Sequence, residues 1–211
     1  MTKYIDRYYL KWEVYGIKFA GGGGWLPTEY QEVEYIQSSG TQYFNVWSTF
    51  SSDYKVVIDF QMLNSTSDQI PIWVKEASDW YTYKYWINVY NNLYYISAWS
   101  DSWATFSADT NRHTITIDKT SVTIDSTSGT INHQSFTYSL GLWVFRYNWN
   151  DPIYSSNKLY GLQIYDENWI LKYDLVPCYR KSDTEIWMYD LVNNVFYTND
   201  VTWSFIKWPD A

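Results

Sequence analysis

Short segments in which apolar and polar residues alternate recur along most of the chain, and they constrain its fold most strongly. The clearest is 114–125, where Ile and Val alternate with Thr on both sides of Lys119-Thr120. A period of two places the apolar side chains on one face of a strand. Such segments return about every 8 to 12 residues from Trp25 onward, a rhythm typical of sandwiches and barrels. Because no segment has a sustained helical period, the sequence predicts an all-β protein of two packed antiparallel sheets.

The predicted strands are short and separated by turn residues. They span residues 32–37, 42–46, 54–63, 69–75, 83–89, 93–98, 113–118, 121–125, 134–138, 143–147, 158–165, 170–176, 185–191, 195–198 and 204–207. Pro177 is expected to end the strand at 170–176 or to mark an edge, because proline has no amide proton to donate. Asn193-Asn194 predicts a turn between two strands of a hairpin.

Composition and charge exclude several classes of protein. The net charge of −8 argues against nucleic-acid binding, which needs clustered Lys and Arg. The longest apolar runs fall short of the roughly 18 residues of a membrane span, and residues 1–6 lack the apolar centre of a signal peptide. The single cysteine, Cys178, cannot form an intrachain disulfide and is expected to be buried.

The first 25 residues are predicted to stand apart from the main domain. Residues 1–20 suggest two short strands, an N-terminal β arm, and residues 21–25 form a glycine-rich linker. A two-stranded piece is only marginally stable by itself. We therefore expect the arm to attach to a partner subunit, and residues 26–211 to form one domain.

Three segments resemble a known family. The stretch Leu171–Tyr197, with DLVPCYRKSD and MYDLVNNVFYTN, resembles the C-terminal signature of a lectin-like domain of bacteriophage tail and prophage proteins. Residues 26–43 resemble its opening strand pair, and residues 158–166 its penultimate strand. The resemblance implies a concanavalin A-like or laminin-G-like jelly roll over residues 26–211, in a virion or extracellular protein released by lysis.

Catalytic motifs are not found in the sequence, so a non-enzymatic protein is predicted. His113 and His133 are too isolated for a zinc site. Glu32 and Glu34, which we place on one strand, do not form the acidic run of a glucanase. The resemblance leaves calcium possible, since laminin-G-like domains sometimes hold it, but the ion stays unassigned because EF-hand spacing is missing. The acidic residues considered as its ligands are Asp53, Asp59, Asp166, Asp174 and Asp190.

The predicted ligand-binding segment follows residue 145, where a cation, a phenol and amides cluster. Its members are Arg146, Tyr147, Asn148, Trp149, Asn150 and Asp151. The resemblance implies that the domain binds a cell-surface glycan or glycoconjugate, with residues 1–20 joining other virion or tail proteins. Two alternatives stay open: a virion assembly or decoration module without glycan binding, and a glycoside hydrolase. A homo-oligomer is among the partners considered.

Fourteen tryptophans are far more than a chain of this length usually has, and several fall where turns are expected. Three interpretations compete: exposed aromatic residues without function, platforms that stack on sugar rings, or positions that hold glycine in the natural product. The third would follow if the gene's UGA codons were read as glycine. The resemblance implies glycine at Trp169, Trp187, Trp203 and Trp208, and Trp12 is a further candidate.

Overall fold

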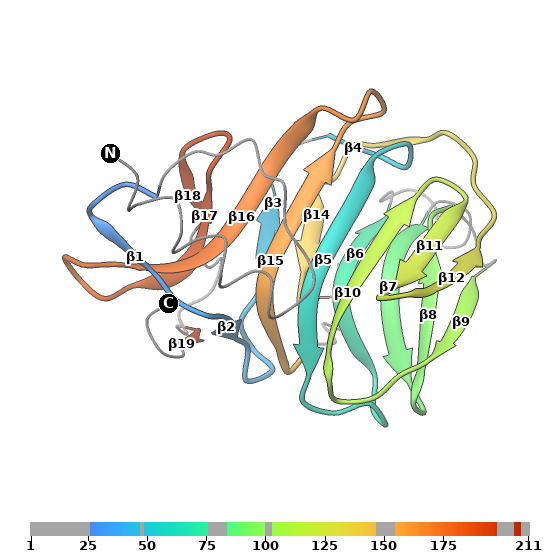
Figure 1. The fold of residues 1–211 in the computed structure, drawn as a ribbon, viewed down its shortest axis with the longest axis horizontal. Helices are drawn as coiled ribbons and strands as arrows, with labels where there is room; N and C mark the ends of the chain where they lie inside the picture. Colours follow the sequence, from blue (N-terminus) through green and yellow to red (C-terminus); the bar gives the residue numbers. More distant parts are fainter. Residues whose placement is uncertain are drawn as a thin grey trace, which may run out of the picture.

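Two antiparallel sheets face each other in the computed structural model of the chain (Figure 1). The structure describes residues 26–46, 49–75, 84–99, 103–146, 155–197 and 205–207. This all-β, two-sheet arrangement confirms what the alternating segments predict. The arm at 1–20 and the linker at 21–25 lie outside the described residues, so both stay predictions. Among the described residues, no helix has the length and hydrophobicity needed to cross a membrane.

The larger sheet contains eleven strands within the described part of the chain. In spatial order, its main row is β12 (Thr127–Thr130), β11 (Ser121–Ile124), β10 (Arg112–Asp118), β5 (Lys55–Met62), β15 (Asn157–Tyr165), β16 (Leu171–Arg180), β17 (Ile186–Asp190) and β18 (Val195–Tyr197). The short strands β1 (Tyr30–Glu32), β2 (Ile36–Gln37) and β19 (Ile206–Lys207) join this row: β1 pairs with β16, and β2 pairs with β15 and β19.

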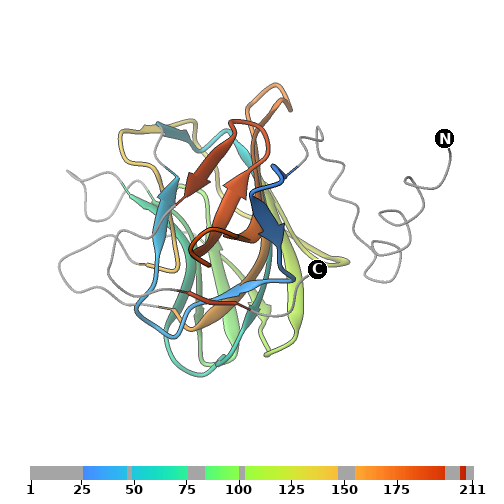
Figure 2. The same cartoon turned by 90° about the vertical axis from the view of Figure 1, so that its left-hand side faces the viewer.

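The smaller sheet has six strands among the residues that the structure describes, and it lies behind the larger sheet in Figure 1. Its order is β3 (Phe44–Val46), β14 (Leu142–Val144), β6 (Gln69–Lys75), β7 (Lys84–Tyr90), β8 (Leu93–Ser97) and β9 (Ala104–Ser107). A separate pair is formed by β4 (Phe50–Ser51) and β13 (Thr137–Tyr138). The chain passes repeatedly from one sheet to the other, and Figure 2 shows the two layers from the side.

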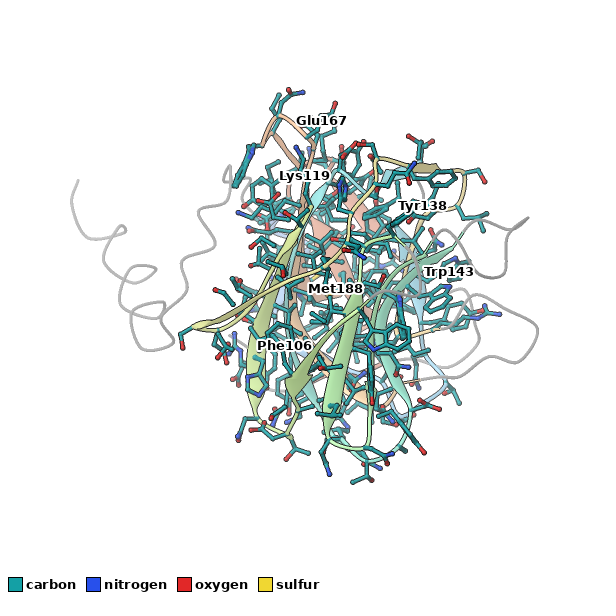
Figure 3. All side chains as sticks on the ribbon, turned by 90° about the vertical axis from the view of Figure 1, so that its right-hand side faces the viewer. Phe106, Lys119, Tyr138, Trp143, Glu167 and Met188 are labelled. Carbon is teal, nitrogen blue, oxygen red and sulfur yellow. The ribbon has the colours of Figure 1, made fainter. Side chains whose placement is uncertain are left out.

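The hydrophobic core fills the space between the sheets. In the larger sheet, Ile115 and Ile117 of β10 and Val122 of β11 are fully buried, as their alternation with threonine predicts. Ile72 of β6 and Ile87 of β7 are buried on the facing side of the smaller sheet. In Figure 3, Met188 lies near the middle of the molecule, and it too is fully buried. Removing this apolar surface from water is the main favourable contribution to folding.

Most predicted strands are present, with bounds shifted by a few residues. The segment at 32–37, predicted as one strand, forms parts of two short strands, β1 and β2. We expected Glu32 and Glu34 on one strand, but only Glu32 lies in a strand. The segment at 134–138 is reduced to β13. The sequence did not predict β4, β9 or β12. The strand β12, Thr127-Ser-Gly-Thr130, lacks apolar alternation because it pairs only at the edge, with β11.

We predicted that Pro177 would end its strand or mark an edge. Instead, Pro177 lies inside β16. Its carbonyl accepts a hydrogen bond from the Val33 amide at 3.0 Å. The nitrogen of Pro177 points to that same side, as in any strand residue. On that side the pairing with β15 stops at Leu175 and the pairing with β1 starts at Cys178. Proline is tolerated because its missing amide proton falls at the point where one neighbouring strand replaces another.

Trp169 lies in the turn between β15 and β16 and adopts the left-handed conformation that the sequence predicts there, with φ of 66°. Its side chain is 61% exposed, and its ring lies 4.4 Å from the Lys55 ammonium. Trp187, grouped with the turn tryptophans by the glycine hypothesis, lies in β17, within the strand predicted at 185–191. It is 3% exposed and packs on Phe205. The remaining candidates, Trp12, Trp203 and Trp208, lie outside the described residues.

We predict that Trp169→Gly stabilises the protein. A bulky residue in the left-handed region costs about 1–2 kcal/mol, whereas the exposed cation–π contact with Lys55 is worth about 0.5–1 kcal/mol. The free energy of unfolding should therefore rise by about 0.5–1 kcal/mol in chemical denaturation. Asn168→Gly in the same turn is the matched control. It should lower the free energy of unfolding, because glycine there only increases the conformational entropy of the unfolded chain. A Trp169→Gly variant that is less stable than the parent would contradict backbone strain at Trp169.

The glycine hypothesis also makes a prediction about the natural product. If codon 169 is UGA and is read as glycine, tryptic peptides from the native source contain glycine at this position. Peptide mass spectrometry and the codon itself measure this directly. A UGG codon would exclude the hypothesis at position 169.

His113 links two loops at one end of the larger sheet. Its Nδ1 lies 2.6 Å from Asp125 Oδ2, and its Nε2 lies 2.9 Å from Asp109 Oδ1. Burial lowers the pKa of His113, but the hydrogen bonds to Asp125 and Asp109 outweigh it, so the pKa is raised. The same contact lowers the pKa of Asp109. With a carboxylate at each nitrogen, the two contacts favour the doubly protonated, positively charged form of the ring.

This linkage predicts a pH-dependent stability. Because the pKa of His113 is raised on folding, its contribution is complete below the unfolded value of about 6.5 and is lost as the pH rises through the folded value. The melting temperature of the parent should therefore approach that of His113→Gln as the pH rises above about 6.5. If the melting temperatures of the parent and of His113→Gln differ by the same amount from acid to alkaline pH, the imidazolium of His113 does not contribute to stability.

Candidate functional site: the outer face of the six-stranded sheet

Six aromatic residues cover the outer face of the smaller sheet, and we call this surface the aromatic face. Its members are Tyr43, Trp73, Trp86, Tyr95, Trp103 and Trp143. Their strand neighbours Phe44, Ile72, Ile87 and Val144 point into the core. In Figure 3, Trp143 lies toward the side of the molecule, away from the central Met188.

The aromatic face is a continuous row across the strands. Trp143, Trp73 and Trp86 are directly opposite one another in the register of β14, β6 and β7. The ring centres of Trp73 and Trp86 are 5.6 Å apart, and the ring planes are inclined at 64° in an edge-to-face contact. The row continues through Trp103, whose ring lies 6.4 Å from Trp86 and 6.2 Å from Tyr95. Trp103 is 45% exposed, so the row is open to solvent at this end.

The local sequence explains why this sheet has a second apolar face. Ile72-Trp73-Val74 and Tyr85-Trp86-Ile87 are apolar without interruption, so both sides of β6 and β7 carry apolar groups. One side fills the core, and the other does not belong to it. An exposed apolar patch commonly marks a binding surface; here Trp103 is the exposed member, whereas Tyr43 and Trp73 are 7% and 3% exposed.

Arg146, the first residue of the predicted ligand-binding segment, lies at the edge of this face. Its guanidinium carbon is 4.2 Å from the ring centre of Tyr43 and 5.2 Å from that of Trp143. Tyr43 and Trp143 are themselves in contact, at 5.6 Å. The structure thus brings Arg146 to the aromatic face, whereas Tyr147, Asn148, Trp149, Asn150 and Asp151 lie outside the described residues.

Polar atoms without hydrogen bonds gather on the same face. Both side-chain atoms of Asn45, which is 2% exposed, are buried and have no hydrogen-bond partner within the described part of the chain. The same holds for Asn88 Oδ1, Trp86 Nε1 and Arg146 Nε. Asn45 lies opposite Trp143, and Asn88 opposite Tyr95. A buried polar atom left unpaired costs about 1–3 kcal/mol. Such a cluster therefore favours a ligand that supplies the missing hydrogen bonds.

The acidic residues considered for calcium are spread over the larger sheet and its turns. Asp59 binds Arg112 through two contacts, 2.8 Å from Nε and 2.6 Å from Nη2. Asp53 accepts a hydrogen bond from Ser135, and Asp166 organises the turn around Trp169. Within the described residues, no three His, Cys, Asp or Glu side chains form a group that suits a metal ion.

Asp174 and Asp190 are also engaged by the protein. Gln163 donates a hydrogen bond to Asp174 at 3.0 Å. Burial raises the pKa of Asp174, and the hydrogen bond from Gln163 lowers it, with a net rise. Asp190 accepts hydrogen bonds from the amides of Asp174 and Val192 and from Asn193 Nδ2. These carboxylates stabilise strands and a turn.

Comparisons with known proteins add no assignment. No family model matches the chain, and no curated protein matches it.

Sequence reasoning named Arg146, which lies beside this face, but did not name the other residues of the face. Asn45, Trp73 and Trp86 belong to three separate segments, and each segment by itself predicts only a strand. The signal in the sequence was the pair of uninterrupted apolar runs at 72–74 and 85–87. A strand with one buried face needs apolar residues only at alternate positions, so these runs indicate apolar side chains on both faces.

Proposed function

We propose that this protein is a non-enzymatic, lectin-like component of a bacteriophage tail or prophage that binds a cell-surface glycan through the aromatic face. The observation that carries the proposal is the coincidence of a row of aromatic rings in mutual contact with unpaired buried amide atoms at Asn45 and Asn88. Sugars offer both matching chemistries: an apolar ring face for an aromatic side chain and hydroxyl groups for amides. The two-sheet architecture is compatible with the jelly roll that the sequence resemblance implies.

The proposal does not depend on the indoles alone. If tryptophan codons on this face were read as glycine, Tyr43, Tyr95, Asn45, Asn88 and Arg146 would remain. The face would then be more open, with tyrosines in place of indoles as the stacking surfaces. Protein from the native source and the chain with tryptophan should then differ in affinity but not in the face that binds.

Two other functions have less support. Glycoside hydrolysis uses two carboxylates that flank the scissile bond, and the six strands of the smaller sheet contain neither Asp nor Glu. A pure assembly module would use the same rings and amides to bind a protein partner, so the glycan array described below distinguishes it from glycan binding. Attachment to other virion proteins through residues 1–20 is compatible with glycan binding and belongs to the same proposal.

We predict that substitutions on the aromatic face weaken binding on an array of bacterial surface glycans. Trp103→Ala and Tyr95→Ala each remove a ring worth about 1 kcal/mol, so affinity for the best glycan should fall roughly fivefold. Trp169→Ala is the matched control, because Trp169 is also exposed but lies on a turn of the other sheet. It should leave affinity unchanged.

Two results would overturn the proposal. One is an array on which the full chain binds no glycan above background. The other is binding that survives Trp103→Ala and Tyr95→Ala but is lost in Trp169→Ala. Thermal melting of each variant separates a loss of binding from a loss of folding.

A further inference from the structure

Both sheets end on the same side of the molecule, each in a strand with one neighbour. Within the described residues, β12 pairs only with β11, and β9 pairs only with β8. Figure 1 shows these two edge strands at the same end of the sandwich. Neither strand contains a charged residue or a proline, which commonly keep an edge strand from pairing with another molecule. This end of the sandwich can therefore accept further strands.

The register shows which backbone groups of β12 point to the open edge. The Ile131 amide donates a hydrogen bond to the carbonyl of Thr120, directly opposite it, so Gly129 forms the next hydrogen-bonded pair with β11. The residues between such pairs direct their amide and carbonyl groups away from the neighbouring strand. In β12 these outward groups belong to Ser128 and Thr130, one on each side of Gly129.

The edge of the smaller sheet is arranged in the same way. The Ala108 amide donates a hydrogen bond to the Asn92 carbonyl opposite it, so Phe106 forms the next hydrogen-bonded pair with β8. Its neighbours Thr105 and Ser107 therefore direct their amide and carbonyl groups to the open edge. Each edge thus presents outward backbone groups on both sides of one central residue.

The two central residues meet across the sandwich. A Cβ atom on Gly129 would lie 2.6 Å from Cζ of Phe106, so the phenyl ring packs directly on the glycine. Figure 3 looks onto this end of the molecule and labels Phe106. A line perpendicular to the sheets at this contact passes close to the middle of both edges. A half-turn about that line continues each sheet into a copy of itself, with the edge strands antiparallel.

We infer that two copies of the chain associate through this end, about a twofold axis that runs close to Gly129 and Phe106 and perpendicular to both sheets. The β12 strands of the two copies pair with each other, and so do the β9 strands. A twofold contact of this kind is self-complementary. Each edge is short by itself, and the coincidence of both edges on one axis is what favours a second copy over a strand of another protein.

The pairing satisfies the outward groups of both edges. Ser128 lies opposite the partner's Thr130, and Thr105 lies opposite the partner's Ser107, so that each pair exchanges backbone hydrogen bonds. All four residues are exposed in the single chain. At the axis, Gly129 meets its own copy and leaves room for close approach. The pairing therefore needs no rearrangement of either sheet.

The association joins the aromatic faces of the two copies, a consequence that rests on the proposed function. The row of rings ends at Trp103, immediately before β9. An axis perpendicular to the sheets keeps the outer faces of both copies on the same side. The two rows then lie on one continuous sheet. Two linked sites bind a repeating polymer more tightly than one site does.

Sedimentation equilibrium of the full chain measures the association. Between about 1 and 100 μM, the mass should rise from that of one chain toward that of two. Thr130→Pro and Ser107→Pro each remove an amide that points to the open edge, so the pairing with β11 and with β8 stays intact. By symmetry each substitution removes its hydrogen bond twice and should weaken the dimer roughly tenfold. The double variant should be monomeric.

Ser128→Ala and Thr105→Ala are the matched controls. They change side chains on the same two edges but keep every backbone amide and carbonyl, so both variants should dimerise as the parent does. Circular dichroism and thermal melting show whether each proline variant keeps its fold. Because the two prolines lie in different sheets, one variant still tests the pairing where the other does not fold.

Cysteine cross-linking tests the register. Phe106→Cys places the two new thiols directly opposite each other across the axis, with Cα atoms about 4.5 Å apart, and mild oxidation should join the copies. Thr105→Cys lies opposite the partner's Ser107, so its two thiols are offset along the strands and their Cα atoms exceed the roughly 7 Å limit of a disulfide. Burial raises the pKa of the Cys178 thiol to about 12, so this residue does not compete.

Three results would overturn the dimer: the mass of one chain at every concentration, a dimer that persists in the double proline variant, or cross-linking of Thr105→Cys as efficient as that of Phe106→Cys. The outcomes also separate this inference from the proposed function. A monomer that still binds glycan through Trp103 overturns the dimer alone, whereas a dimer that binds no arrayed glycan overturns the proposed function alone.

Discussion

The structure depends on each sheet burying one complete face against the other. Residues of both sheets, such as Ile58 of β5 and Tyr85 of β7, lose all contact with water in the space between them. A slip of one residue in any strand would exchange the buried face for the exposed one, so this burial also fixes the register. The outer faces are then free of any role in the core, and their residues must be explained separately.

The outer faces of the two sheets differ in whether their polar side chains have hydrogen-bond partners. On the larger sheet, polar side chains pair with each other: Asp59 with Arg112, and Asp174 with Gln163. The guanidinium of Arg112 also lies 3.8 Å from the ring centre of Tyr160. On the smaller sheet, the amide of Asn45 stays unpaired within the described residues. The outer face of the smaller sheet thus combines aromatic rings with a buried amide that has no partner among the described residues.

The parts of the fold that sequence reasoning predicted are local ones. In the hairpin of β10 and β11, Lys119 takes the positive φ of a tight turn, and the alternation around it sets the buried face. In the hairpin of β17 and β18, Asn194 has φ of 56°, and the Asp190 carboxylate binds the amide of Val192 in the turn. Such features depend on neighbours within a few residues, so the sequence contains the whole signal.

The sequence by itself determined that the chain alternates, where it turns, and which side of each strand is apolar. Only the tertiary structure decided which strands are neighbours: β14 lies between β3 and β6, which places Asn45, Trp143 and Trp73 in one row. The physical reason is that a period of two specifies the face of a strand but not its partner. The partner is set by hydrogen bonds and packing between segments that are far apart in the chain. The same reason applies to Pro177. β16 continues through this residue because β1 replaces β15 as its neighbour there, and this pairing depends on segments far apart in the chain.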